Sequence, residues 1–281
     1  DWLEGFPLPR EQTELIGHSV AAAELHDGYA GGRLHHAILL TGPKGIGKST
    51  LAFRFARFVL SHPDPAKAPP TASGLLPADD RVAAMVSTGA HPNLLHLRRP
   101  WDEKAKKVKT QLTVDEVRKT VTFFGNAAGV DGYRIAIVDA ADDMNVSAAN
   151  ALLKMLEEPP KRSLFLVLSH APGRLLPTIR SRCRRLALDP LAPDDLDAAL
   201  TSLGLTVAEG DKPSLTALAE GSVRRAIECI ENNGLEVHRQ FRSLADAFPR
   251  LDRPRLYRFA DAVAGRKGAD SFDLCADLAR G

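Results

Sequence analysis

Residues 36–49, HAILLTGPKGIGKS, join a short apolar run to a glycine-rich turn and then to the start of a helical pattern. The turn matches the pattern GxxxxGK[ST] in full, from Gly42 to Ser49. Glycines let the backbone N–H groups turn inward around an anion, and the dipole of the following helix adds positive potential there. This strand–turn–helix unit constrains the chain to an α/β fold with a phosphate-binding loop.

Apolar runs alternate with helical patterns up to residue 189. Each run is short and almost continuously apolar, which is typical of strands that helices cover on both faces. The predicted strands are 36–41, 94–97, 134–139, 163–169 and 184–188, and the predicted helices are 48–60, 79–88, 113–124 and 145–157. The alternation indicates a three-layer α/β domain with a mainly parallel sheet.

Beyond residue 189 the strand signals vanish. Short helical segments at 194–203, 214–219 and 223–231 are separated by Gly and Pro, and a helical pattern returns from about residue 235. We therefore predict an α/β domain at 1–189, a small all-α domain at 190–234 and the start of a further helical domain at 235–281.

Composition excludes several classes of protein. The formal net charge is only +2, so any nucleic-acid contact must rest on a local patch rather than on a global field. The three cysteines are far apart and form no CxxC pair, so neither a disulfide framework nor a zinc site is expected. With no apolar stretch of about 18 residues and no visible signal peptide, we expect a cytoplasmic protein without a membrane contact.

The phosphate-binding loop predicts the chemistry of its side chains. Lys48 is expected to reach the β- and γ-phosphates of ATP, and Ser49 to ligate magnesium. Asp139 ends an apolar strand and is the magnesium partner expected of such a site. Ala140 follows it and cannot act as a base for the attacking water. Asp142 or Asp143 could substitute, although both are expected to lie beyond the end of the strand.

Two basic runs stand out. Arg182 lies in the run RSRCRR, and arginine suits stabilisation of a phosphoryl-transfer transition state because it donates two hydrogen bonds and keeps its charge. Surface ion pairs are the alternative for these arginines. Residues 101–110, WDEKAKKVKT, carry four lysines. A solvated hairpin or loop is the simpler interpretation, and a contact with a phosphate backbone is the alternative.

Four segments together resemble the clamp-loader branch of the AAA+ ATPases: GPKGIGKST, VDAADDMNVSAANALLKMLEEPP, LSHAPGRLLPTIRSRCRRL and GSVRRAIE. Within that branch, Ala140 and the pair Ser169-His170 look most like a non-motor subunit of bacterial DNA polymerase III. The resemblance implies a RecA-like P-loop NTPase domain with a parallel sheet, a helical lid and a helical collar through which subunits assemble.

The resemblance also implies site residues. Arg182 matches an arginine finger that reaches the ATP of a neighbour, and Arg224 matches a lid arginine that senses the γ-phosphate. Ser169 or His170 occupies the first sensor position, and Ile16 lies in the segment near the adenine. The implied nucleotide-binding residues of the loop are Gly42, Pro43, Lys44, Gly45, Ile46, Gly47, Lys48, Ser49 and Thr50. Many relatives carry a four-cysteine zinc module after the P-loop helix, but residues 62–92 contain no cysteine, so no zinc is expected.

The resemblance leaves two functions open. In the first, the chain binds ATP and Mg²⁺ and acts as a stator that supplies Arg182 to a neighbouring ATPase subunit while the sliding clamp is loaded on primed DNA. In the second, it is a motor subunit that hydrolyses its own ATP, since the P-loop is intact. The implied partners are the ATPase (tau/gamma) and delta subunits and, in the assembled complex, the sliding clamp and primer–template DNA. The missing carboxylate at position 140 favours weak or absent ATPase activity.

Overall fold

The computed structural model describes residues 3–70, 75–125 and 132–247, together with positions 253, 254, 256, 257 and 259. The chain divides into two compact units, Asp1–Pro190 and Leu191–Gly281. Each unit is described by itself below.

The first unit is built on a five-stranded parallel sheet with the strand order β2-β5-β6-β1-β7. In chain order, the strands are β1 (Ala37–Thr41), β2 (Leu94–Leu97), β5 (Arg134–Val138), β6 (Ser163–Ser169) and β7 (Arg184–Ala187). Each of the five predicted strands is confirmed, with its ends displaced by no more than a single residue. The predicted α/β class with a mainly parallel sheet is therefore correct.

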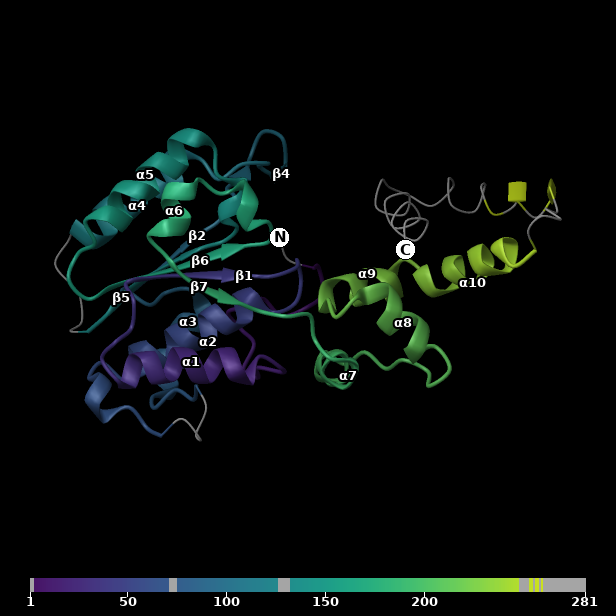
Figure 1. Cartoon of the computed structure of the whole chain (residues 1–281), viewed down its shortest axis with the longest axis horizontal. Coiled ribbons are helices and arrows are strands. Elements are labelled where there is room, and N and C mark those ends of the chain that lie inside the picture. The colour runs from purple at the N-terminus through teal and green to yellow at the C-terminus, as the bar shows by residue number, and fades with distance from the viewer. Residues whose placement is uncertain are drawn as a thin grey trace. The chain divides into compact units, whose positions relative to one another are not determined.

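Helices cover both faces of this sheet (Figure 1). On one face lie α1 (Ser19–Ala30), α2 (Lys48–Ser61) and α3 (Asp80–Thr88), and on the other lie α4 (Val114–Gly125), α5 (Val146–Glu157) and α6 (Pro177–Ser181). Asn145 caps α5 as predicted, since its side chain accepts a hydrogen bond from the N–H of Ala148 at 2.9 Å. Single 3-10 turns are η1 (Pro65–Lys67), η3 (Ala141–Asp143) and η4 (Pro172–Arg174).

Helix α1 was not predicted from the sequence. Its N-cap is His18, which has a left-handed backbone conformation (φ 57°) and makes no side-chain capping bond. The helix is rich in alanine, so its apolar residues do not form a narrow stripe. The usual start signal and the usual periodicity are both weak here.

The core forms two layers because side chains alternate across the strands. On β5, Ile135 and Ile137 pack with the apolar residues of α2, whereas Ala136 and Val138 pack with those of α4 and α5. All four residues are fully buried. This double burial explains why the strands read as continuous apolar runs.

Strand β7 is an edge of the sheet, since β1 is the only described strand that pairs with it. Its side chains Arg184 and Arg185 are exposed. Arg184 forms an ion pair with Glu24 at 2.8 Å, and Arg185 donates to the hydroxyl of Thr41 at 3.2 Å. The edge strand therefore carries two adjacent cations.

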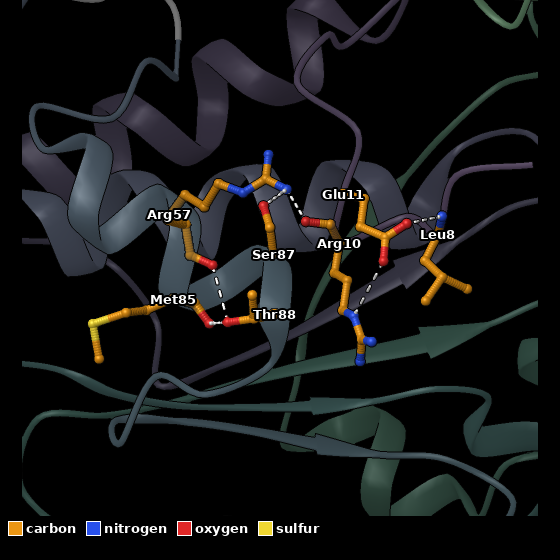
Figure 2. A network of polar contacts seen from close by, with 8 residues as sticks. Leu8, Arg10, Glu11, Arg57, Met85, Ser87 and Thr88 are labelled. Atoms are coloured by element: carbon orange, nitrogen blue, oxygen red, sulfur yellow. Dashed lines mark hydrogen bonds and ion pairs between the residues drawn. The ribbon is translucent and has the colours of Figure 1, made fainter.

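Arg57, on α2, ties the N-terminal segment to the P-loop helix (Figure 2). Its side chain is only 4% exposed, and it donates to the backbone carbonyls of Arg10 and Gln12 and to the hydroxyl of Ser87. Burial lowers the pKa of Arg57, and the neighbouring Arg54 adds to this effect. The segment before α1 is thus fixed by hydrogen bonds to its carbonyls.

A two-stranded antiparallel hairpin, β3 (Trp101–Asp102) and β4 (Lys107–Val108), follows β2 and precedes α4 along the chain. It contains the lysine run of residues 101–110, for which the sequence predicted a hairpin or a loop. Residues 62–78 were predicted as a loop; their described part holds only the turn η1, and residues 71–74 lie outside the described residues.

The second unit is helical in its described part. Its helices are α7 (Pro193–Ser202), α8 (Lys212–Ala219), α9 (Val223–Glu231) and α10 (Gly234–Ala245). The division into a lid at 190–234 and a collar at 235–281 stays a prediction, and most residues of the collar range after residue 247 lie outside the described residues. Among described residues, no helix has both the length and the apolarity needed to span a membrane.

Candidate nucleotide site

The loop between β1 and α2 requires glycine at several positions. Gly42, Gly45 and Gly47 have φ values of 146°, 80° and 105°, a region that side chains with a Cβ rarely adopt. A Cβ on Gly42 would lie 2.4 Å from the carbonyl oxygen of Leu188. The loop conformation therefore depends on these residues, as the sequence motif predicted, and it curls the chain into the N-terminus of α2.

Lys48 is the buried cation of this loop. Its side chain is 4% exposed, and its Nζ donates to the carbonyls of Gly42 at 2.7 Å and Pro43 at 2.5 Å. Burial lowers the pKa of Lys48 to about 8, although the nearby carboxylates of Asp139 and Asp142 partly oppose this. Two neutral carbonyls compensate a buried ammonium poorly, so an anionic phosphate would be a much better partner.

Ser49, in the first turn of α2, and Asp139, directly after β5, meet at the carboxyl edge of the sheet. Ser49 Oγ donates to Asp139 Oδ2 at 3.1 Å. His96, which lies in β2, places its Nε2 3.8 Å from the same oxygen. Burial alone would raise the pKa of Asp139, but the His96 ring and the Ser49 hydroxyl outweigh it and lower the pKa. The hydroxyl and the ionised carboxylate are hard oxygen ligands of the kind that Mg²⁺ prefers, so these residues fit a magnesium ion.

The residues after Asp139 make different contacts. Ala140 is 8% exposed and carries no acceptor. Asp142 accepts hydrogen bonds from Ser169 Oγ at 2.6 Å and from the backbone N–H groups of His170 at 2.5 Å and Ala171 at 3.3 Å.

Asp143 is also engaged, because its Oδ2 lies 3.4 Å from Nε of Arg99. Both carboxylates that could have replaced a catalytic glutamate are therefore held by other groups.

The two candidate sensor residues differ in what they can offer a phosphate. Ser169 is fully buried at the end of β6 and directs its hydroxyl to Asp142. His170 follows, and its buried Nδ1 has no hydrogen-bond partner among the described residues. Burial lowers the pKa of His170, and the charge of Lys48 lowers it further, so the ring is neutral at pH 7. Of the pair, His170 has the uncommitted polar atom.

The N-terminal segment reaches the P-loop through His18. Its Nε2 donates to the carbonyl of Ile46 at 2.6 Å, and the ring lies 3.5 Å from the position of a Cβ on Gly47. Ile16, the residue predicted near the adenine, is half-buried two positions earlier. The predicted segment thus adjoins the loop.

The two predicted arginines each form an ion pair with a glutamate. Arg182, in the turn after α6, forms an ion pair with Glu157 at 2.6 Å and donates to the carbonyl of Thr178 at 3.3 Å. Its side chain is 37% exposed, and neither of these partners belongs to the P-loop. Arg224 lies on α9 in the second unit, where it pairs with Glu228 at 2.9 Å.

Sequence reasoning missed two participants, His96 and Glu157. A histidine inside the apolar run LLHL was the available signal for His96, because β2 ends at the same sheet edge as β5. Glu157 gave no such signal, since its contact with Arg182 forms only when α5 and α6 pack together.

Comparison with known proteins identifies the relatives of this chain. Residues 17–192 match the family model described as DNA polymerase III, delta subunit. The chain is 39% identical over 199 residues to DNA polymerase III subunit delta' of Pseudomonas aeruginosa, a match that covers 68% of this chain and 55% of that protein. It is 32% identical over 203 residues to the delta' subunit of Bacillus subtilis, covering 71% of this chain and 54% of that protein.

Two more distant similarities were also found. The chain is 27% identical over 227 residues to the gamma/tau subunit of Mycobacterium tuberculosis, covering 79% of this chain and 37% of that protein. A solved structure of a gamma subunit-related protein from Thermotoga maritima gives a TM-score of 0.48 at 18% identity, covering 94% of this chain and 83% of that one. The chain spans about half the length of the curated delta' relatives it matches. The two delta' subunits above are each more than 30% identical to this chain, and the chain belongs to the family described as DNA polymerase III, delta subunit.

Proposed function

We propose that this chain acts as a delta'-type subunit of a bacterial clamp loader, one that binds ATP·Mg²⁺ but hydrolyses it poorly. One observation carries the proposal: the residues that would hold phosphates and magnesium are assembled, whereas the position that would carry the catalytic base is Ala140.

The binding half of this proposal rests on Lys48, Ser49 and Asp139. The loop cradle that a Cβ at Gly42 would fill and the buried ammonium of Lys48 both fit a bound phosphate. Ser49 and Asp139 supply the magnesium ligands. The remaining loop residues, from Pro43 to Thr50, would contribute backbone N–H groups and walls.

The hydrolytic half rests on what surrounds Ala140. A general base typically contributes about 10²–10⁴-fold to a rate. Asp142 and Asp143 are engaged by Ser169 and Arg99, so neither is placed as a ready substitute. Nucleotide binding needs no proton acceptor at position 140. The absence of a base there should therefore lower turnover and leave affinity unchanged.

The stator role rests on Arg182. Its guanidinium is partly exposed and is held by Glu157 and the carbonyl of Thr178. An arginine oriented in this way suits insertion into the ATP site of an adjoining tau/gamma subunit. In this proposal, bound nucleotide sets the angle of the lid through Arg224 and thereby the presentation of Arg182.

The proposed assembly follows from the relatives, which are named as subunits of DNA polymerase III. We propose an ATPase domain at 1–189, a lid at 190–234 and a collar from 235 that joins the tau/gamma and delta subunits. The complex would act in the cytoplasm, where it loads the sliding clamp onto primer–template DNA.

The second candidate is an active motor subunit that hydrolyses its own ATP. The complete P-loop favours it, as does the similarity to a gamma/tau subunit. Ala140 opposes it.

Calorimetry and a turnover assay on the full chain separate the two candidates. We expect saturable binding of ATP·Mg²⁺ with turnover at background level. Robust hydrolysis by the isolated wild-type chain would establish the motor, and an absence of binding would contradict both.

A second experiment tests Arg182 in the complex reconstituted with tau/gamma and delta subunits. Arg182→Ala should leave assembly intact and slow hydrolysis at the adjoining site, where an arginine supplied in trans is worth on the order of 10³–10⁵-fold. The total ATPase rate will fall less, because the other sites keep their own arginines. Arg180→Ala is the matched control, since Arg180 is an exposed arginine in the last turn of α6, two residues before Arg182. Equal rates in the two variants would refute the finger assignment.

A further inference from the structure

The β3–β4 hairpin is a formed ribbon rather than a loose loop. Trp101 pairs with Val108 and Asp102 with Lys107, and the N–H of Lys109 continues the ladder by donating to the carbonyl of Pro100 at 2.9 Å. The Asp102 carboxylate closes the turn by accepting the N–H groups of Lys104 and Ala105, each at 3.0 Å. The positions of the side chains on this ribbon are therefore defined by its register.

The hairpin carries an excess of unneutralised positive charge. Its four lysines are exposed, and none of them forms an ion pair of 4.0 Å or less with a described residue: Lys104, Lys106, Lys107 and Lys109. The turn N–H groups lower the pKa of Asp102, as do the charges of Lys109 and Lys107, so this carboxylate is ionised and already used within the turn. Glu103 is the only other acidic residue of the ribbon.

Helix α4, which follows directly, shows the opposite pattern. Its cations are paired within the helix, Arg118 with Asp115 at 3.5 Å and Lys119 with Glu116 at 2.7 Å. The lack of ion pairs among the hairpin lysines is thus a property of the hairpin that the neighbouring helix α4 does not share.

The spacing of the lysines suits a phosphate backbone. Lys107 and Lys109 are two residues apart in an extended strand and so project from the same face of the ribbon, about 6.7 Å apart. Two nucleotides of one DNA strand rise by about the same distance, roughly 6.8 Å. Trp101 lies on the opposite face and is 50% exposed.

We propose that the β3–β4 hairpin is a contact surface for the sugar-phosphate backbone of DNA. Lysine is depleted in the cores of protein–protein interfaces, whereas lysine-to-phosphate contacts provide most of the sequence-independent affinity for nucleic acids. Long, flexible lysine side chains set no requirement on base sequence. The contact would therefore depend only on the charge and the spacing of the phosphates. This surface lies outside the P-loop.

The test measures fluorescence anisotropy of labelled 20-nucleotide DNA, single-stranded and duplex, with the full chain between 25 and 200 mM salt and without ATP. The hairpin variant changes all four lysines to Gln: K104Q, K106Q, K107Q and K109Q. The control variant makes the same change in net charge at exposed lysines elsewhere: K67Q, K119Q, K154Q and K161Q. Both variants must keep the wild-type thermal unfolding midpoint; if the hairpin variant does not, the pair K107Q/K109Q replaces it.

Each phosphate contact contributes about 0.7 to the salt slope for a single strand and about 0.9 for a duplex. We expect the slope to fall by about 3 in the hairpin variant, with a loss of affinity on the order of 10²-fold at 50 mM salt. The control variant should lose far less.

Equal losses in the two quadruple variants would show that only net charge matters, and the proposal would fail. It would also fail if the wild-type chain did not bind DNA at 25 mM salt. Polyglutamate provides the third arm: if it binds as tightly as DNA and loses its binding in the same variant, the hairpin is a surface for an acidic protein instead.

Discussion

The two sides of the nucleotide site use their polar groups in different ways. On the P-loop side, Lys48 donates to carbonyls of its own loop and Ser49 to Asp139. In the proposed function, a phosphate and a magnesium ion would replace these contacts. On the β5–β6 side, Asp142 holds a hydroxyl and two backbone N–H groups at the end of β6.

The difference separates binding from hydrolysis. Contacts that a ligand can exchange are suited to binding, whereas contacts that terminate a strand are structural and expensive to release. The chain therefore keeps a site ready for nucleotide beside a catalytic position whose nearest carboxylates serve the fold. Each of the following experiments acts on one side and should leave the other unchanged.

The largest expected effect comes from returning a carboxylate to position 140. Ala140→Glu should raise the turnover of the isolated chain by on the order of 10²-fold, the lower end of what a general base supplies, since no neighbour contributes an arginine. A coupled phosphate-release assay measures it. Ala140→Gln, of equal size, is the control, and equal turnover in both variants would show that the missing base is not what limits hydrolysis.

Removing the buried ammonium acts on the binding side alone. Lys48→Ala deletes at least one charge-assisted hydrogen bond to phosphate, worth about 1.5–3 kcal/mol, so affinity for ATP·Mg²⁺ should fall by about 10–10²-fold. Calorimetry measures the change. Lys44→Ala, at an exposed position of the same loop, should cost less, and a loss as large as that of Lys48→Ala would contradict the role assigned to Lys48.

Asp142 tests the structural side. Asp142→Ala leaves the Ser169 hydroxyl and two N–H groups without their acceptor, and we expect the free energy of unfolding to drop by about 2–3 kcal/mol. Denaturant titration followed by circular dichroism checks it. Asp142→Asn keeps one acceptor oxygen and should cost less. If instead Asp142→Ala kept full stability and lost nucleotide binding, the assignment of the two sides would have to be reversed.

The smallest effect is a pH dependence of binding. Because burial lowers the pKa of Lys48 to about 8 in the free protein and a bound phosphate would raise it, nucleotide binding takes up a proton above that pH. Affinity should be nearly constant up to pH 7 and fall by about tenfold between pH 7 and pH 9. Calorimetry across this range measures it, and a constant affinity up to pH 9 would show that Lys48 does not titrate there.

Sequence reasoning reached the fold of the first unit because its strands are buried on both faces and its P-loop has a defined position between a strand and a helix. It missed α1, whose alanine-rich sequence carries neither a capping residue nor a narrow apolar stripe. In the candidate site it predicted the residues whose types are dictated by phosphate and magnesium chemistry, and the binding roles of these residues stay predictions. It could not find that Asp142 holds Ser169, because a contact between residues 27 positions apart depends on the packing of two strands.

Strand β7 has a consequence for solubility. An edge strand exposes a row of unpaired backbone groups and can recruit a strand from another molecule. Here Arg184 and Arg185 stand exposed on that edge, so an incoming strand would have to lie beside two guanidinium groups and remove water from them. Within the run RSRCRR, Arg182 pairs with Glu157 of α5, whereas Arg184 and Arg185 would oppose the addition of a strand from another molecule at this edge.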